Sequence, residues 1–77
     1  MTIETKVRKI IAEKLSRVDI EDVLPEASLV DDLGADSLAL VELMMTMEEQ
    51  FEIDMDEDES DKLRTVQDVI DYIKSRS

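Results

Sequence analysis

The sequence of 77 residues contains no cysteine, no histidine and no tryptophan. Because cysteine thiolates and histidine imidazoles are the usual activated nucleophiles and general bases, their absence closes the common routes to nucleophilic catalysis. The absence of cysteine also excludes disulfides and thiolate–zinc clusters. We therefore expect a protein that is not an enzyme.

Aromatic residues are scarce as well, at 3% of the chain, whereas hydrophobic residues of all kinds make up 43%. The core must therefore consist of aliphatic residues and methionine, whose flexible side chains repack more easily than large rings. A chain of this length is near the small end of what folds alone. We predict one domain over residues 1–77 with a deformable interior.

Positive charge is in short supply: 9 lysines and arginines stand against 21 aspartates and glutamates, which gives a formal net charge of -12. Such a chain is repelled by nucleic acids and anionic membranes, and it is attracted to partners with basic docking patches. No apolar run approaches the length of a membrane span, and no secretory signal is recognisable. We expect a cytoplasmic monomer that binds neither nucleic acid nor membranes.

Apolar residues recur at helical spacing in two segments, residues 3–15 and residues 66–73. Thr2 and Thr65 precede these segments, and threonine is a favoured N-cap because its hydroxyl accepts a hydrogen bond from a free backbone N–H. Asp68, three residues after Thr65, supplies the acidic partner of a capping box. The sequence therefore predicts an amphipathic helix over each of the two segments.

Between these helices, Asp36 can cap a helix that runs to about Phe51, and a short acidic helix is predicted over about Glu57–Leu63. No alternating pattern or hairpin turn predicts a strand. The single glycine, Gly34, stands where the chain must turn sharply into the central helix. The long connection over residues 16–35 needs apolar anchors. We expect these anchors to be Val18, Ile20, Val23, Leu24, Leu29, Val30 and Leu33.

The central helix has two apolar faces. At ~100° per residue, the natural core face contains Leu40, Leu43, Met44, Met47 and Phe51. The second face contains Leu38, Val41 and Met45, bordered by Glu42, Glu48, Glu49 and Glu52. This face either packs under the long connection or forms an interaction stripe with an acidic border. We favour the interaction stripe, because the acidic side chains would be poorly solvated beneath a loop.

Ser37 is the first residue of the central helix if Asp36 is its cap. Backbone N–H groups near Ser37 then lack intrahelical partners, and the positive end of the helix dipole lies there. A phosphodiester on the serine oxygen is electrostatically favourable at such a position. Taken alone, an arbitrary serine here is more often an ordinary polar residue of the first helical turn.

Four segments carry a family resemblance: "VRKIIAEKL", "LGADSL", "VELMMTMEEQF" and "TVQDVIDYI". In this order, on a small acidic chain, they resemble the freestanding acyl carrier proteins of fatty acid and polyketide synthesis. The resemblance spans nearly the whole chain. It implies an all-α fold, a four-helix bundle with a short third helix and a long first loop, whose interior parts to admit an acyl chain.

The resemblance also implies roles for individual residues. Ser37 would carry 4′-phosphopantetheine, attached from coenzyme A by a phosphopantetheinyl transferase (holo-acyl-carrier-protein synthase). Partner recognition would fall to Asp36, Leu38, Val41, Glu42, Met45, Glu48 and Glu49. The acyl pocket would contain Leu43, Met44, Met47 and Phe51. The implied partners are this transferase together with acyltransferases, ketosynthases, reductases and dehydratases that have basic docking patches.

Three departures from the family pattern bear on the pathway. Ala39 stands where many fatty-acid carriers have an acidic residue, and Met55 and Asp56 replace a common isoleucine and proline. Arg64 is basic where a small polar residue is usual. These departures leave open whether the chain serves fatty acid synthesis or a specialised acyl or polyketide route.

Other readings of the sequence fit less well. Asp54, Asp56 and Asp58 match the start of an EF-hand loop, but its sixth position is Glu59 and its twelfth is Thr65, so no dedicated metal site is predicted. A peptidyl or aminoacyl carrier would use the same cofactor for other cargo, and such carriers are commonly less acidic. A purely structural acidic helical module is the remaining alternative, in which the serine is incidental.

Overall fold

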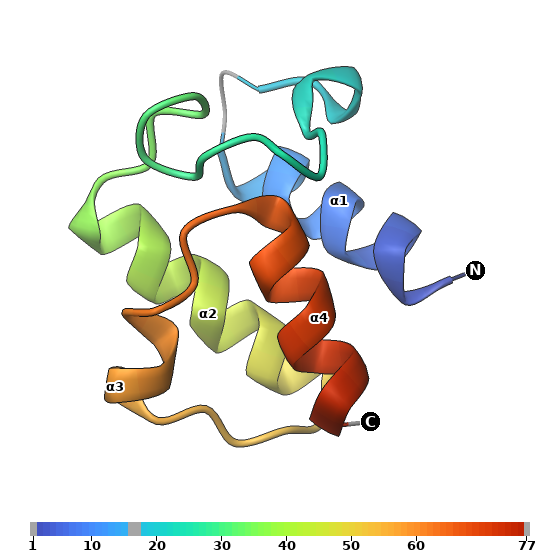
Figure 1. The fold of residues 1–77 in the computed structure, drawn as a ribbon, viewed down its shortest axis with the longest axis vertical. Coiled ribbons are helices and arrows are strands. Elements are labelled where there is room, and N and C mark those ends of the chain that lie inside the picture. Colours follow the sequence, from blue (N-terminus) through green and yellow to red (C-terminus); the bar gives the residue numbers. More distant parts are fainter. Residues whose placement is uncertain (1, 16–17, 77) are drawn as a thin grey trace.

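The computed structural model describes residues 2–15 and 18–76, with the side chains of residues 57 and 60 excepted (Figure 1). Its elements are α1 (Ile3–Lys14), the 3₁₀ turn η1 (Ile20–Asp22), α2 (Ser37–Phe51), α3 (Glu57–Ser60) and α4 (Val66–Arg76). The described residues form no strand, and one isolated bridge pairs Ser28 with Thr65. The predicted all-helical class is confirmed.

The finer prediction, a four-helix bundle with a short third helix, is not confirmed in its helix count. Helices α1, α2 and α4 have 12, 15 and 11 residues, whereas α3 is a turn of 4 residues. The prediction that this short helix reaches Leu63 is wrong, because it ends at Ser60. The N–H of Lys62 donates to the carbonyl of Glu59 at 3.2 Å. This tighter i to i−3 spacing ends the helix, and the following Leu63 packs against the core.

The helix starts follow the capping residues of the sequence. Thr2 Oγ1 accepts a hydrogen bond from the N–H of Thr5 at 3.2 Å, which fixes the start of α1. At α4, Thr65 Oγ1 accepts from the N–H of Asp68, and Asp68 Oδ2 accepts in return from the N–H of Thr65, both at 3.2 Å. This reciprocal pair is the predicted capping box.

The core lies among α1, α2 and α4, and α1 contacts both of the other helices. Its helical members are Val7, Ile10, Ile11, Leu43, Met44, Met47, Val66, Val69, Ile70 and Ile73. As predicted, these side chains are aliphatic or methionine. Phe51 is only half-buried at the edge, where the Lys6 ammonium lies 5.1 Å from its ring centroid.

The connection that leads to α2 crosses the end of the molecule where α2 and α4 begin (Figure 1). Residues 16 and 17 of the predicted connection lie outside the described residues. Among the predicted anchors, Val23 and Leu29 are fully buried. The prediction is wrong for Leu24 and Val30, whose side chains are 46% and 53% exposed. Buried Ala27 and Ala35 pack in the core instead, because small side chains fit where the loop backbone lies close to the helices.

Polar contacts to the backbone hold this connection in place. Arg8 of α1 donates from Nε to the carbonyl of Val23 at 2.9 Å and from Nη2 to the carbonyl of Ile20 at 3.0 Å. The N–H of Val66, the first residue of α4, donates to the carbonyl of Ala27 at 3.1 Å. The loop is therefore tied to both α1 and α4 rather than held by apolar contacts alone.

None of the described helices is long and apolar enough to cross a lipid bilayer.

Candidate functional site

Ser37 is the first residue of α2, and its side chain is exposed. The preceding Asp36 is the N-cap: its Oδ1 accepts from the N–H of Ala39 at 2.8 Å, and its carbonyl accepts from the N–H of Leu40 at 2.9 Å. The N–H groups of Ser37 and Leu38 have no acceptor within the helix. The positive end of the helix dipole therefore surrounds the serine, which favours an anionic group on its oxygen.

The turn before Ser37 is held by a glycine conformation and by a buried alanine. Gly34 has φ of +71°, a left-handed conformation that favours glycine. Any other residue would be strained there by its backbone conformation, even though an added Cβ would meet open space. Ala35 is 3% exposed, and its N–H donates to the carbonyl of Leu29 at 2.9 Å. The chain thus turns at Gly34, is held in the core at Ala35 and emerges at Ser37. The serine is displayed on a fixed support.

A hollow of about 490 Å³ lies beside Ser37. Its lining residues come from the connection, from α2 and from the segment between α3 and α4: Ser28, Val30, Asp31, Ser37, Leu40, Val41, Met44, Asp61, Leu63 and Arg64. Met44 is 6% exposed and Leu40 and Leu63 are half-buried, so the inner part of the hollow is apolar. The charged residues Asp31, Asp61 and Arg64 are exposed. The hollow beside Ser37 is therefore apolar inside, with charged residues exposed around it.

The three apolar residues of the second face of α2 are exposed: Leu38 by 68%, Val41 by 55% and Met45 by 59%. They do not pack under the connection, which was the alternative interpretation of this face. Glu42 and Glu49 beside them are also exposed, and Glu48 is half-buried. We call these three apolar residues with their acidic border the α2 stripe.

The four residues predicted to form an acyl pocket are placed differently from one another. Leu43 and Met47 are fully buried, and Phe51 is half-buried at the edge of the core. Met44 belongs both to the core and to the lining of the hollow beside Ser37. The structure therefore brings Met44 together with Ser37, and the role of the pocket stays a prediction.

Sequence reasoning missed the contribution of Val30, Leu63 and Arg64 to the surroundings of Ser37. Leu63 and Arg64 lie on the segment before α4, far from Ser37 in the chain, and Val30 lies on the irregular connection that precedes α2. Helical periodicity relates residues within one element only. No local signal could have placed them beside the serine, although the unusual charge of Arg64 marked it for attention.

The segment that carries Arg64 is held by Asp68. Asp68 Oδ2 accepts from the N–H of Arg64 at 3.1 Å and from the N–H of Thr65 at 3.2 Å. These bonds stabilise the charged form of the carboxylate, with the N–H of Arg64 as the largest contribution, and they lower the pKa of Asp68. The start of α4 and the wall of the hollow are thus fixed by the same side chain.

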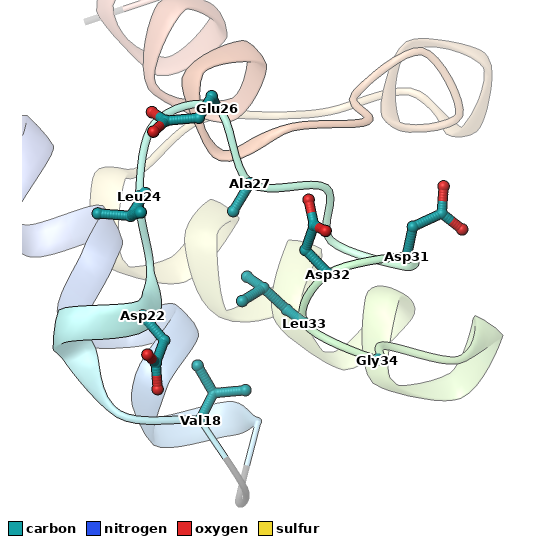
Figure 2. A pocket seen from close by; sticks show the side chains of 9 residues that line it. All are labelled: Val18, Asp22, Leu24, Glu26, Ala27, Asp31, Asp32, Leu33 and Gly34. Atoms are coloured by element: carbon teal, nitrogen blue, oxygen red, sulfur yellow. The ribbon is translucent and has the colours of Figure 1, made fainter.

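A second hollow, of about 590 Å³, is framed by the connection itself (Figure 2). It is lined by Val18, Asp22, Leu24, Glu26, Ala27, Asp31, Asp32, Leu33 and Gly34. None of these residues belongs to α2, and the charged ones are all carboxylates. Within the described part of the chain, no group of three acidic residues is arranged to hold a metal ion. Ser37 is not among the residues that line this hollow.

Comparisons with known proteins agree with this geometry. A family model described as a phosphopantetheine attachment site matches residues 5–73. The chain is similar to the acyl carrier protein of Desulforapulum autotrophicum, with 69% identity over 77 residues and all of both chains covered. It is 54% identical to the acyl carrier protein of Nitratidesulfovibrio vulgaris strain Miyazaki F over 76 residues, which cover 99% of each chain.

The fold also has a close match among solved structures. A candidate acyl carrier protein from Mycobacterium tuberculosis superimposes with a TM-score of 0.89 at 31% identity. The match covers 96% of this chain and 97% of the other.

Proposed function

The chain belongs to the acyl carrier proteins, and from this membership we propose that Ser37 is the serine whose oxygen carries the 4′-phosphopantetheine cofactor of the family. The observation that carries the proposal is the display of Ser37: it is exposed, begins α2 and borders a hollow with an apolar interior. The cofactor supplies a terminal thiol, on which acyl groups are carried as thioesters.

Attachment requires little chemistry from the chain. The Ser37 hydroxyl attacks the pantetheine-bound phosphorus of the coenzyme A diphosphate. The bond from this phosphorus to the bridging oxygen breaks, adenosine 3′,5′-bisphosphate leaves with that oxygen, and the hydroxyl proton passes to a base. Because the sequence has no histidine, we assign that base to a separate phosphopantetheinyl transferase. The chain itself presents the hydroxyl, and the free N–H groups at the start of α2 stabilise the phosphodiester that forms.

Partner recognition is the second part of the proposal. Asp36 and Leu38 flank the modified serine, and the α2 stripe extends from them along the helix. The exposed apolar side chains offer contact area, while Glu42, Glu48 and Glu49 attract basic patches and set the register of docking. The partners are the transferase and acyltransferases, ketosynthases, reductases and dehydratases that elongate and modify the cargo. We place the chain in fatty acid synthesis or a related acyl route, because its relatives are named acyl carrier proteins.

Intact mass spectrometry tests the attachment site. Incubation with coenzyme A and a broad-specificity transferase is expected to add one phosphopantetheine to the parent protein and none to Ser37→Ala. Ser28→Ala is the matched control, because Ser28 lines the same hollow and the substitution removes an equivalent hydroxyl. This control is expected to be modified fully. Addition to Ser37→Ala, or no addition to the parent, contradicts the proposal.

A further inference from the structure

Arg64 is the cation among the residues that line the hollow beside Ser37. The other charged lining residues are Asp31 and Asp61, whose carboxylates repel any anion placed there. In a chain with a net charge of -12, this arginine is, among the described residues that line the hollow, the one group that attracts an anion by its charge.

The backbone of Arg64 is fixed on both sides. Its N–H donates to Asp68 Oδ2 at 3.1 Å, and its carbonyl accepts from the N–H of Leu29 at 2.9 Å. These two bonds tie the residue to α4 and to the connection that also frames the hollow. The side chain therefore starts from a defined point on the wall of the hollow that Ser37 also lines.

The guanidinium of Arg64 is available for a ligand. Among the described arginines, Arg8 donates to two backbone carbonyls, and Arg76 binds the Glu59 carboxylate. The guanidinium of Arg64 is exposed and makes no hydrogen bond or ion pair with any described residue.

We propose that Arg64 is a positioning residue that binds the phosphodiester of the arm attached at Ser37 and directs the arm into the adjacent hollow. The inference rests on the proposed function, because it requires the arm on Ser37. The phosphate is bonded directly to the serine oxygen, so it lies at the entrance of the hollow that Arg64 lines. A guanidinium suits it, since its planar fork of N–H donors matches two phosphate oxygens at once.

This contact has a consequence for the rest of the arm. Beyond the phosphate, the gem-dimethyl carbon of the pantoyl unit would lie near Leu40 and Leu63, which are half-buried in the same hollow. The arm would then spend part of its time along this path rather than moving freely in solvent. Arg64 would set the direction in which cargo leaves Ser37, and its loss would broaden that distribution.

A double cycle tests the contact between Arg64 and the arm. One change is the substitution of Arg64, and the other is the attachment of the arm. Melting temperatures are measured for the apo and cargo-free holo forms of the parent, Arg64→Gln and Lys62→Gln. Lys62 is the matched control, because it is an exposed cation two residues earlier and is not among the residues lining the hollow. Using the form without cargo ensures that no carboxylate of an acyl group contributes. Both variants keep the backbone bonds of residue 64, so the fold is expected to persist.

Attachment of the arm is expected to raise the melting temperature more in the parent and Lys62→Gln than in Arg64→Gln, by about 2–4 °C at low salt. This gap should close in about 1 M salt, where the Debye length falls to about 3 Å. As a second readout, nuclear Overhauser contacts between the arm's geminal methyls and the Leu63 methyls are expected in the holo parent and weakened in holo Arg64→Gln. The inference is overturned if the arm raises the melting temperature equally in Arg64→Gln and Lys62→Gln. It is also overturned if the contacts between the arm and Leu63 are the same in holo Arg64→Gln as in the holo parent. If the parent gains no phosphopantetheine mass, the proposed function itself fails.

Discussion

Nη2 of Arg76, in the last turn of α4, lies 2.8 Å from Oε1 of Glu59 in α3. The Tyr72 hydroxyl donates a hydrogen bond to the same carboxylate, and the Arg76 guanidinium lies 5.1 Å from the centroid of the Tyr72 ring. A helix of one turn is not stable alone, because nucleation costs more than its few hydrogen bonds return. This cluster on α4 is therefore a principal reason that α3 has a defined position.

The cluster predicts a loss of stability at high pH. The hydrogen bond from the Tyr72 hydroxyl to the Glu59 carboxylate, together with desolvation, raises the pKa of Tyr72. Because the folded pKa exceeds the unfolded value of about 10, this contribution is fully present below about pH 10 and is lost as the pH rises through the higher folded pKa. Urea unfolding of the parent and Tyr72→Phe between pH 8 and 11 measures it. The stability of Tyr72→Phe is expected to fall less steeply above pH 10, and equal slopes would count against the cluster.

Asp68 predicts the opposite pH dependence. Its pKa is lowered by hydrogen bonds from the N–H groups of Arg64 and Thr65, so its contribution is present above the unfolded pKa of about 4 and is lost as the pH falls through the lower folded value. Asp68→Asn keeps an acceptor oxygen but loses the charge that strengthens both backbone hydrogen bonds, so it is expected to destabilise the fold by about 1 kcal/mol at pH 7. That difference should shrink below about pH 4.

Asp71→Asn is the control for this measurement. It removes the same charge from the same helix. Among the described residues, Asp71 accepts one hydrogen bond, from the side-chain amide of Gln67, and an asparagine oxygen can accept it as well. Its effect is expected to stay within about 0.5 kcal/mol. If both variants respond alike to pH, the cap has no special role.

The acidic border of the α2 stripe predicts salt-sensitive docking. Replacing Glu42 and Glu48 by lysine is expected to slow the modification of Ser37 by a transferase about tenfold at low salt, because opposite charges set encounter rate and register. The gap should narrow as salt rises. Glu4→Lys with Glu13→Lys, two reversals on exposed positions of α1, makes the same change in net charge away from the stripe. Equal slowing in both double variants would show that net charge alone matters.

Local signals in the sequence predicted the helix starts well. Thr2, Asp36 and Thr65 each place an oxygen within reach of the N–H three residues later, a geometry that depends on only a few residues. The exposure of Val41 and Met45 also followed from helical periodicity once the core face had been chosen. Such features are set within one element, so they can be read from the chain.

The features that sequence reasoning missed depend on segments far apart in the chain. Leu24 and Val30 were expected to be buried because they are apolar, but an irregular loop has no period that tells which side chains point inward. Arg8 donates to two loop carbonyls 12 and 15 residues away, a contact that no local pattern encodes. The same limit applies to Arg64, whose position beside Ser37 depends on the return of the chain to α2.

Three methionines of α2 allow the predicted acyl pocket to be tested by chain length. Met44 lines the hollow beside Ser37, Met47 is fully buried in the core, and Met45 is 59% exposed on the α2 stripe. Truncating a buried methionine to alanine costs about 2–5 kcal/mol and leaves a cavity. Met44→Ala and Met47→Ala should both destabilise the apo form by such amounts, and Met45→Ala by less than about 0.5 kcal/mol.

An acyl chain that enters from Ser37 would fill these cavities in order. At a rise of about 1.5 Å per residue, Met44 lies about 10 Å along the axis of α2 from Ser37, and Met47 lies about 15 Å from it. The acyl chain begins at the thiol of the arm, so these positions set an order and not a length: a shorter chain should restore the melting temperature of Met44→Ala, because it occupies apolar volume only in the folded state. Met47→Ala should need a longer chain, and Met45→Ala should gain no more than the parent. Melting curves of each variant loaded with four to twelve carbons measure this order. If the same chain length restored the melting temperatures of Met44→Ala and Met47→Ala, or if no length restored either, the acyl chain would not enter between Ser37 and the core.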